Sequence, residues 1–91
     1  MIYKVLLSRK AQHILDVFFE SYQGTAQNSD MQYRAFICSR VLSCLAYFDA
    51  YQDETYCVNQ CNYLNIDNLC IVEFAKENNV ILVNDLHFMV F

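Results

Sequence analysis

The sequence predicts an α+β fold in the order strand, helix, helix, and then three strands, with the helical hairpin packed on a small antiparallel sheet. Three observations predict it. An apolar run of strand length opens the chain, two segments with a helical apolar period follow, and residues 55–91 hold only short apolar runs between polar clusters. Because 91 residues leave room for a single core, we expect one domain over residues 1–91.

The N-terminal segment predicts a strand followed by a helix. Ile2–Leu7 is an apolar, β-rich run, and the hydroxyl of Ser8 can cap the first turn of a following helix. Apolar residues then recur on a period of about 3.6, which predicts a helix over about residues 9–23. The members of this stripe are Ala11, Ile14, Leu15, Phe18, Phe19 and Tyr22. Gly24, the only glycine, lies where a left-handed helix C-cap is expected.

A second helix is predicted from Ser29 to about Tyr51. Ser29 to Gln32 has the capping-box pattern, in which each end residue bonds the backbone amide of the other. The apolar stripe of this helix comprises Tyr33, Phe36, Ile37, Val41, Cys44, Leu45 and Phe48. Arg40 falls at the border of the stripe. A connection of about six residues between two amphipathic helices predicts antiparallel packing.

Residues 55–91 predict strands joined by tight connections. Tyr56–Ile66 is a weak strand region interrupted by asparagines, and the sequence leaves open one strand, two strands or a loop there. The remaining elements are a turn at Asp67-Asn68, a strand at Leu69–Phe74, a reverse turn at Ala75–Asn79 and a strand at Val80–Phe88. Links this short require antiparallel pairing. The N-terminal strand must join the same sheet, because its backbone groups need partners.

Composition and charge narrow the class of protein. A hydrophobic content of 56% excludes a disordered chain. No apolar run reaches the roughly 18 residues of a membrane span, and the N-terminal run is too short for a signal peptide. We therefore expect a cytoplasmic protein without a membrane partner. Residues 1–40 carry five basic and three acidic side chains, whereas residues 41–91 carry one basic and seven acidic side chains. Only residues 1–40 could therefore offer a basic face to nucleic acid.

The cysteines predict neither disulfides nor a metal centre. There are five of them, Cys38, Cys44, Cys57, Cys61 and Cys70, and an odd number fits a disulfide framework poorly. The spacing of Cys57 and Cys61 differs from that of a zinc knuckle, and the two histidines are far away in sequence. We expect reduced thiols that pack as small apolar side chains, and neither a metal nor a cofactor.

The candidate catalytic residues are few. RNA cleavage without a metal needs a general base, a general acid and cations for the phosphate. Histidine is the only side chain whose unperturbed pKa lies near neutral pH, and the chain has two, His13 and His87. His87, near the end of the last strand, is the candidate, whereas His13 on the polar face of the first helix is expected to be solvated. Arg34, Arg40 and Lys4 are candidate cations, but the two arginines lie on nearly opposite sides of their helix.

Two parts of the chain resemble a known family. Tyr3–Ala11, followed by Ile14–Asp16, is similar to the start of toxins of the ParE/RelE superfamily, which belong to type II toxin–antitoxin and plasmid stabilisation systems. Cys70–Phe74, Val80–Val83 and Leu86-His87 resemble the last hairpin of that family. The long helical hairpin is closer to the ParE branch. The resemblance implies a RelE/ParE-like fold, an antitoxin protein as partner, and DNA gyrase or the ribosome as target.

Several positions depart from the family pattern. The proline and glycine that usually follow the second helix are absent from Ala50–Tyr56, and the arginine usual before the final hairpin turn falls on Cys70 or Ile71. Nothing basic follows Lys76. The chain is also acidic, with a net charge of −4, whereas toxins of this family tend to be basic.

These departures leave three functional hypotheses. The first is a ParE-like toxin that acts by binding a protein. The second is a RelE-like ribosome-dependent mRNA endonuclease, for which His87, Arg34 and Arg40 would be the catalytic residues. The third is a non-catalytic family member that serves only as an interaction module. The same surface is compatible with a homodimer that hides apolar patches.

Overall fold

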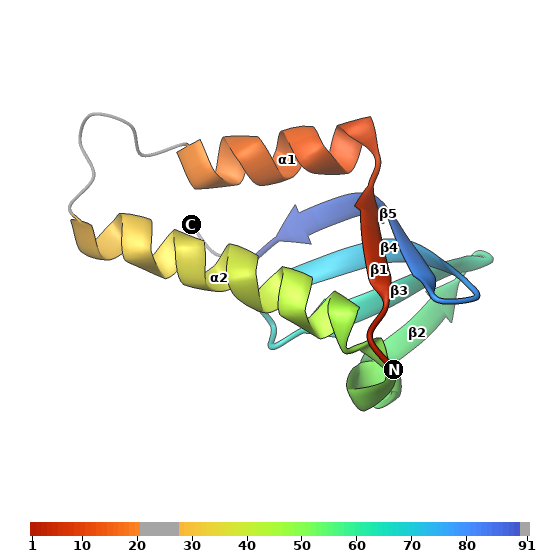
Figure 1. Cartoon of the computed structure of the whole chain (residues 1–91). Coiled ribbons are helices and arrows are strands. Elements are labelled where there is room, and N and C mark those ends of the chain that lie inside the picture. Colours follow the sequence, from red (N-terminus) through yellow and green to blue (C-terminus); the bar gives the residue numbers. More distant parts are fainter. Residues whose placement is uncertain (21–27, 90–91) are drawn as a thin grey trace.

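The computed structural model describes residues 1–20 and 28–89, except for the side chains of residues 28–31. It confirms the predicted α+β class, with the two helices and the sheet sharing one hydrophobic core (Figure 1). The elements are β1 (Lys4–Leu7), α1 (Arg9–Glu20), α2 (Asn28–Ala46), the 3₁₀ helix η1 (Phe48–Glu54), β2 (Thr55–Val58), β3 (Cys61–Ile66), β4 (Cys70–Glu77) and β5 (Val80–Phe88). No helix among these residues is long and apolar enough to cross a membrane.

The sheet has five strands in the order β1-β5-β4-β3-β2. Strands β2 to β5 pair antiparallel with their sequence neighbours, as predicted from the short links. Strand β1 joins the same sheet but runs parallel to β5, from Lys4 opposite Val80 to Leu7 opposite Val83. The expectation of a purely antiparallel sheet is therefore wrong at this edge. Both helices lie between β1 and β5 in the chain, which is the long crossover that a parallel pair needs.

Tight turns connect the last four strands, with two residues between β2 and β3, three between β3 and β4, and two between β4 and β5. Asn59-Gln60 has φ of 50° and 68°, so the region left open in the sequence is a hairpin of β2 and β3. Asp67-Asn68 forms the predicted turn, with φ of 53° and 57°. The third turn is shorter than expected, because β4 continues to Glu77 and leaves only two residues before β5. Asparagine and aspartate tolerate this left-handed backbone better than other non-glycine residues.

Helix α1 begins as the sequence predicts. The Ser8 hydroxyl accepts a hydrogen bond of 3.1 Å from the Ala11 amide, and the Ser8 carbonyl accepts one of 2.9 Å from Gln12. The same hydroxyl donates to the Asn84 carbonyl at 3.0 Å, which ties the helix start to β5. The predicted C-cap at Gly24 lies outside the described residues, as does Tyr22.

Helix α2 begins at Asn28, and the proposed cap by the Ser29 side chain lies outside the described side chains. The α-helical backbone ends at Ala46 rather than near Tyr51, and η1 continues the chain as a tighter 3₁₀ helix. Figure 1 shows α1 and α2 running side by side in opposite directions, as the short connection predicted.

Both predicted apolar stripes are buried only where they face the sheet. On α2 and the start of η1 the buried members are Ile37, Val41, Cys44, Leu45 and Phe48. Tyr33 and Phe36 were expected in the core but are 51% and 59% exposed, because the first half of α2 extends beyond the sheet (Figure 1). On α1, Phe18 is buried, whereas its neighbour Phe19 is 43% exposed.

A bulge in β5 aligns its apolar residues with β4. Phe74 pairs with Val83 but Glu73 pairs with Asp85, so β5 has one extra residue at Asn84. The side chains of β5 that contribute to the core are Ile81 and Val83 before the bulge and Leu86 and Phe88 after it. Their spacing of two residues therefore becomes three across the bulge. The extra residue lets both halves of the strand face the core.

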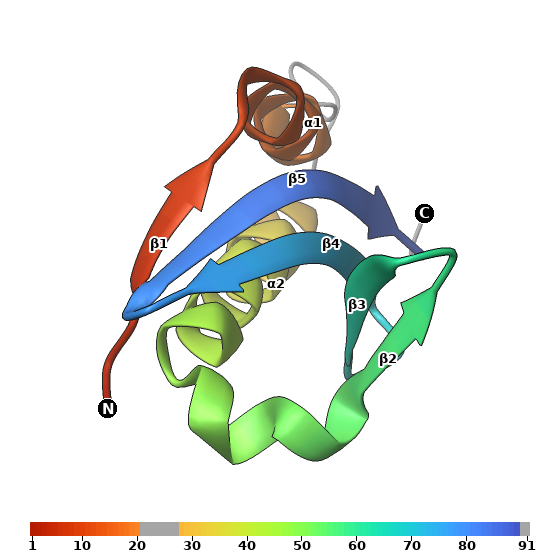
Figure 2. The same ribbon diagram turned by 90° about the vertical axis from the view of Figure 1, so that its right-hand side faces the viewer.

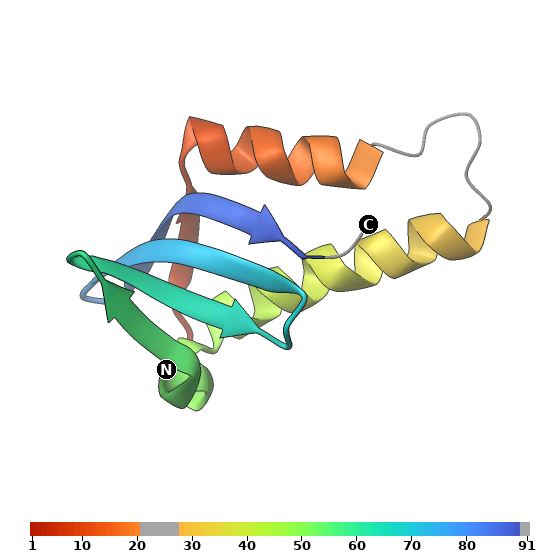
Figure 3. The ribbon, with the colours of Figure 1, turned by 180° about the vertical axis from the view of Figure 1, so that it is seen from behind.

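The sheet curves around α2 (Figure 2). Helix α2 lies within this curve, and α1 lies beside β1 and β5. Figure 3 shows the molecule from behind, with the sheet in front of α2. The face of the sheet that points away from α2 is not covered by a helix of the described chain. The edges of the sheet are β1 and β2.

Candidate functional site

A groove runs between α1 and the end of β5. Its volume is about 450 Å³, and its walls are mainly apolar. The lining residues are His13, Ile14, Val17, Phe18, Arg34, Leu86, His87 and Phe88, and we call this cavity the α1–β5 groove. It therefore brings together His87 and Arg34, two of the three predicted site residues, with the second histidine of the chain.

A stack of aromatic rings and a guanidinium builds one wall of the groove. The rings of Phe18 and Phe88 are parallel within 2°, with centroids 3.8 Å apart. The guanidinium of Arg34 lies 4.4 Å above the Phe18 ring and donates a hydrogen bond of 2.6 Å to the Phe18 carbonyl. Arg34 is thus held in place by α1, so its charge is fixed at the groove.

The two histidines reach the groove from different elements. His13 projects from α1, and His87 stands opposite Ile71 in the pairing of β5 with β4. Both side chains are exposed, as expected for His13. Two imidazoles and a fixed cation are the group types that metal-free phosphodiester cleavage requires. The sequence carried no signal that His13 and His87 share a cavity, because their proximity arises only when α1 packs on β5.

Arg40 lies away from the groove. Its Nε is 2.6 Å from Oδ2 of Asp67, its Nη1 donates to the Tyr51 hydroxyl at 3.1 Å, and its guanidinium is 5.4 Å from the centre of the Tyr51 ring. The hydrogen bond to Asp67 raises the pKa of Arg40 above its already high ordinary value. The structure therefore separates Arg40 from Arg34. Lys4 is exposed on β1 and lines neither this groove nor the cavity beside Arg40.

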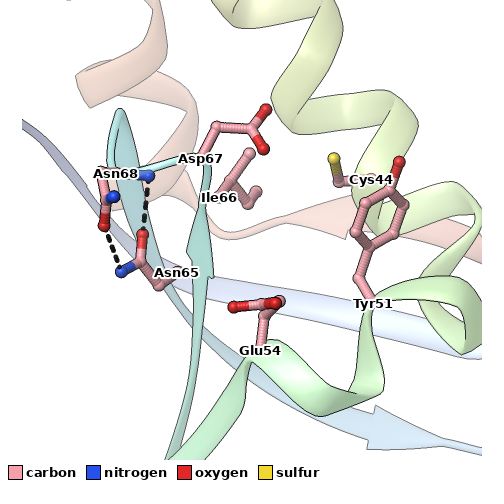
Figure 4. Close-up of a pocket in the computed structure, with 7 residues that line it drawn as sticks. All are labelled: Cys44, Tyr51, Glu54, Asn65, Ile66, Asp67 and Asn68. Carbon is pink, nitrogen blue, oxygen red and sulfur yellow. Dashed lines mark hydrogen bonds between the residues drawn. The ribbon is translucent and has the colours of Figure 1, made fainter.

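A second cavity lies between the end of α2, η1 and the β3–β4 turn. It has a volume of about 280 Å³, and we call it the turn pocket (Figure 4). Its lining residues are Cys44, Tyr51, Glu54, Asn65, Ile66, Asp67 and Asn68. Asn65 braces the turn, because its Oδ1 accepts from the Asn68 amide at 3.1 Å and its Nδ2 donates to Asn68 Oδ1 at 3.0 Å.

The cysteines are all free thiols. Cys44 and Cys70 are buried and Cys57 is exposed. Burial raises the pKa of the Cys70 thiol to about 12, which keeps it protonated at neutral pH. Among residues 1–20 and 28–89, no group of three histidine, cysteine or carboxylate side chains is placed to hold a metal ion.

Comparison with known proteins gives a structural similarity but no sequence match. No family model matches the sequence, and no curated protein matches it. The structure is similar to a chain of the solved structure described as "Chromosomal ParDE TA system from P. aeruginosa", with a TM-score of 0.66 and 11% sequence identity. The match covers 98% of each chain. At this identity the likeness shows a shared fold, which is the ParE-like fold that the sequence resemblance implied.

Proposed function

We propose that this chain is the toxin component of a type II toxin–antitoxin pair, that it acts by binding a protein target, and that an antitoxin protein neutralises it. The observation that carries the proposal is the fold likeness to a chain of a ParDE toxin–antitoxin system over 98% of both chains. Since a fold alone does not determine function, the surfaces of this chain must be consistent with the role.

The exposed surface of the helices favours protein binding. Val17 and Phe19 on α1 and Tyr33 and Phe36 on α2 are large apolar side chains that are all more than 40% exposed. Val17 also lines the α1–β5 groove, which has mainly apolar walls. Exposed apolar surface of this kind marks sites where another protein docks. A gyrase-type target fits the proposal, because the long helical hairpin resembles the ParE branch.

The charge distribution also favours a protein target over RNA. Residues 41–91, which comprise the end of α2, η1, and strands β2 to β5 with their turns, carry seven acidic side chains and one basic one. Contacts with phosphates supply most of the affinity of proteins for nucleic acid, and this excess of acidic side chains opposes them. Asp67 also neutralises Arg40, which therefore adds no available positive charge.

A RelE-like mRNA endonuclease is the second candidate, and one observation favours it. His13, His87 and Arg34 line the same groove, which supplies one residue for each of the roles of base, acid and cation. This arrangement gives the second candidate a defined site. The third hypothesis, a non-catalytic interaction module, needs only the exposed apolar surface.

Expression of the chain in a bacterium without its antitoxin tests the proposal. We expect growth arrest, with a change in plasmid supercoiling before any loss of full-length mRNA. Arrest in which mRNA fragments first, with supercoiling unchanged, would replace the proposal by the endonuclease. Normal growth with abundant folded protein would reject both toxin hypotheses and leave the interaction module.

A further inference from the structure

The turn pocket carries a negative charge that no described residue neutralises. Glu54 and Asp67 are the two carboxylates that line it. Asp67 is paired with Arg40, whereas Glu54 makes no hydrogen bond or ion pair with any described residue. In Figure 4 the Glu54 carboxylate points into the space between Tyr51 and Asn65. The pocket therefore has one unpaired anionic group facing its interior.

The walls of the pocket are fixed before any ligand arrives. The Leu69 amide closes the β3–β4 turn on the Ile66 carbonyl at 2.8 Å, and the Asn65 side chain braces the same turn. At the end of η1, the Thr55 hydroxyl donates to the Gln52 carbonyl at 2.7 Å, next to Glu54. A site with fixed walls loses little conformational entropy on binding.

The size and chemistry of the pocket fit one long basic side chain. Its volume of about 280 Å³ is at the lower end for small-molecule sites, so it suits a side chain better than a nucleotide or a large cofactor. Ile66 and the Tyr51 ring offer apolar surface for an aliphatic stem, and Glu54 offers a carboxylate for its charged end. Arg40, which does not line the pocket, already shows that Tyr51 and Asp67 can hold a guanidinium.

We propose that the turn pocket binds the guanidinium of an arginine side chain from a protein partner, with Glu54 as its counter-ion. Arginine fits better than lysine, because its planar fork can donate two hydrogen bonds to one carboxylate. The acidic balance of residues 41–91 attracts a basic segment towards this side of the molecule. This site is separate from the α1–β5 groove and does not depend on the toxin function.

The test is a titration of the full-length ¹⁵N-labelled chain with N-acetyl-arginine amide, followed by NMR. We expect saturable shifts of the amides of Glu54, Asn65 and Asn68, and none with N-acetyl-citrulline amide, which has the same shape without the charge. Glu54→Gln should weaken binding by about tenfold, since a charged hydrogen bond is lost. Asp53→Asn is the matched control, because Asp53 lies beside Glu54 on η1 but does not line the pocket.

Three outcomes would overturn the inference. The first is the absence of saturable shifts with the arginine probe. The second is equal binding of the citrulline probe, or of the arginine probe to the folded Glu54→Gln variant. The third is much tighter binding of agmatine than of the blocked arginine, because a preference for the free amine would indicate a small molecule rather than a protein side chain.

Discussion

The ring of Phe18 lies flat against that of Phe88, with centroids 3.8 Å apart, and so joins α1 to the end of β5. Arg34 on α2 covers the Phe18 ring from 4.4 Å, so one residue from each of three elements meets at the wall of the α1–β5 groove. The stability of the helices and the shape of the groove therefore depend on the same contacts.

Replacing Phe18 by alanine should lower the free energy of unfolding by about 3 kcal/mol, because the change leaves a cavity and removes the ring stack. Phe19→Ala is the matched control, since the neighbouring ring is 43% exposed, and it should cost less than about 1 kcal/mol. Urea unfolding followed by circular dichroism measures both. Equal losses for the two variants would contradict the described packing of α1.

Ser8→Ala should destabilise the chain by about 1 to 2 kcal/mol, because the hydroxyl both caps α1 and donates to the Asn84 carbonyl. Ser39→Ala on the exposed side of α2 is the control and should leave stability nearly unchanged. Thermal or urea unfolding gives both values. A Ser8→Ala variant as stable as the parent would show that the cap does not hold the start of α1.

Cys70 should make the chain less stable at alkaline pH. Its folded-state pKa is raised to about 12 by burial, so between the ordinary thiol pKa and 12 the folded state retains a proton that the unfolded state loses. Stability is therefore full below the unfolded pKa and should fall by about 1.5 kcal/mol between about pH 8 and pH 10. Cys70→Ala should reduce this dependence of the free energy of unfolding on pH. Cys57→Ala, the control at an exposed thiol, should leave it unchanged. Equal slopes for all three proteins would contradict the buried thiol.

Most of the fold could be predicted from the sequence, because it is encoded locally. The Ser8 cap, the stripe around Val41 and the turn at Asp67-Asn68 each depend on neighbouring residues, and the structure has all three. The exposure of Phe36 and Phe19 could not be predicted. A stripe shows which side of a helix is apolar, but the extent of the sheet beneath it decides how much of the stripe is buried.

The candidate site could be predicted only in part. His87 and Arg34 were candidates from their chemistry, and the structure places both in the α1–β5 groove with His13. Arg40 instead pairs with Asp67, a contact between α2 and a turn that no local pattern indicates. The parallel pairing of β1 and the bulge at Asn84 are also long-range features that no local pattern indicates.

The double variant His13→Gln/His87→Gln separates the two toxin candidates. If the chain acts by binding a protein, the variant should still arrest growth, because both histidines are exposed and glutamine keeps their polar character. If the chain cleaves mRNA, the loss of both proton-transfer groups should restore growth and leave mRNA intact. Growth curves and mRNA blots after induction give the result. Fragmentation of mRNA by the parent chain that the double variant no longer causes would contradict the protein-binding mechanism.

The most direct test of the account is the viable count after induction of three proteins at equal soluble levels. The parent should arrest growth, and Val17→Asp, which places a charge in the α1–β5 groove at a site 52% exposed, should relieve the arrest. Val58→Asp, at a site 49% exposed on β2 outside the groove, should arrest growth like the parent. Growth of cells that express the parent chain, or arrest by Val17→Asp as strong as that by the parent, would contradict a toxin that acts through this groove.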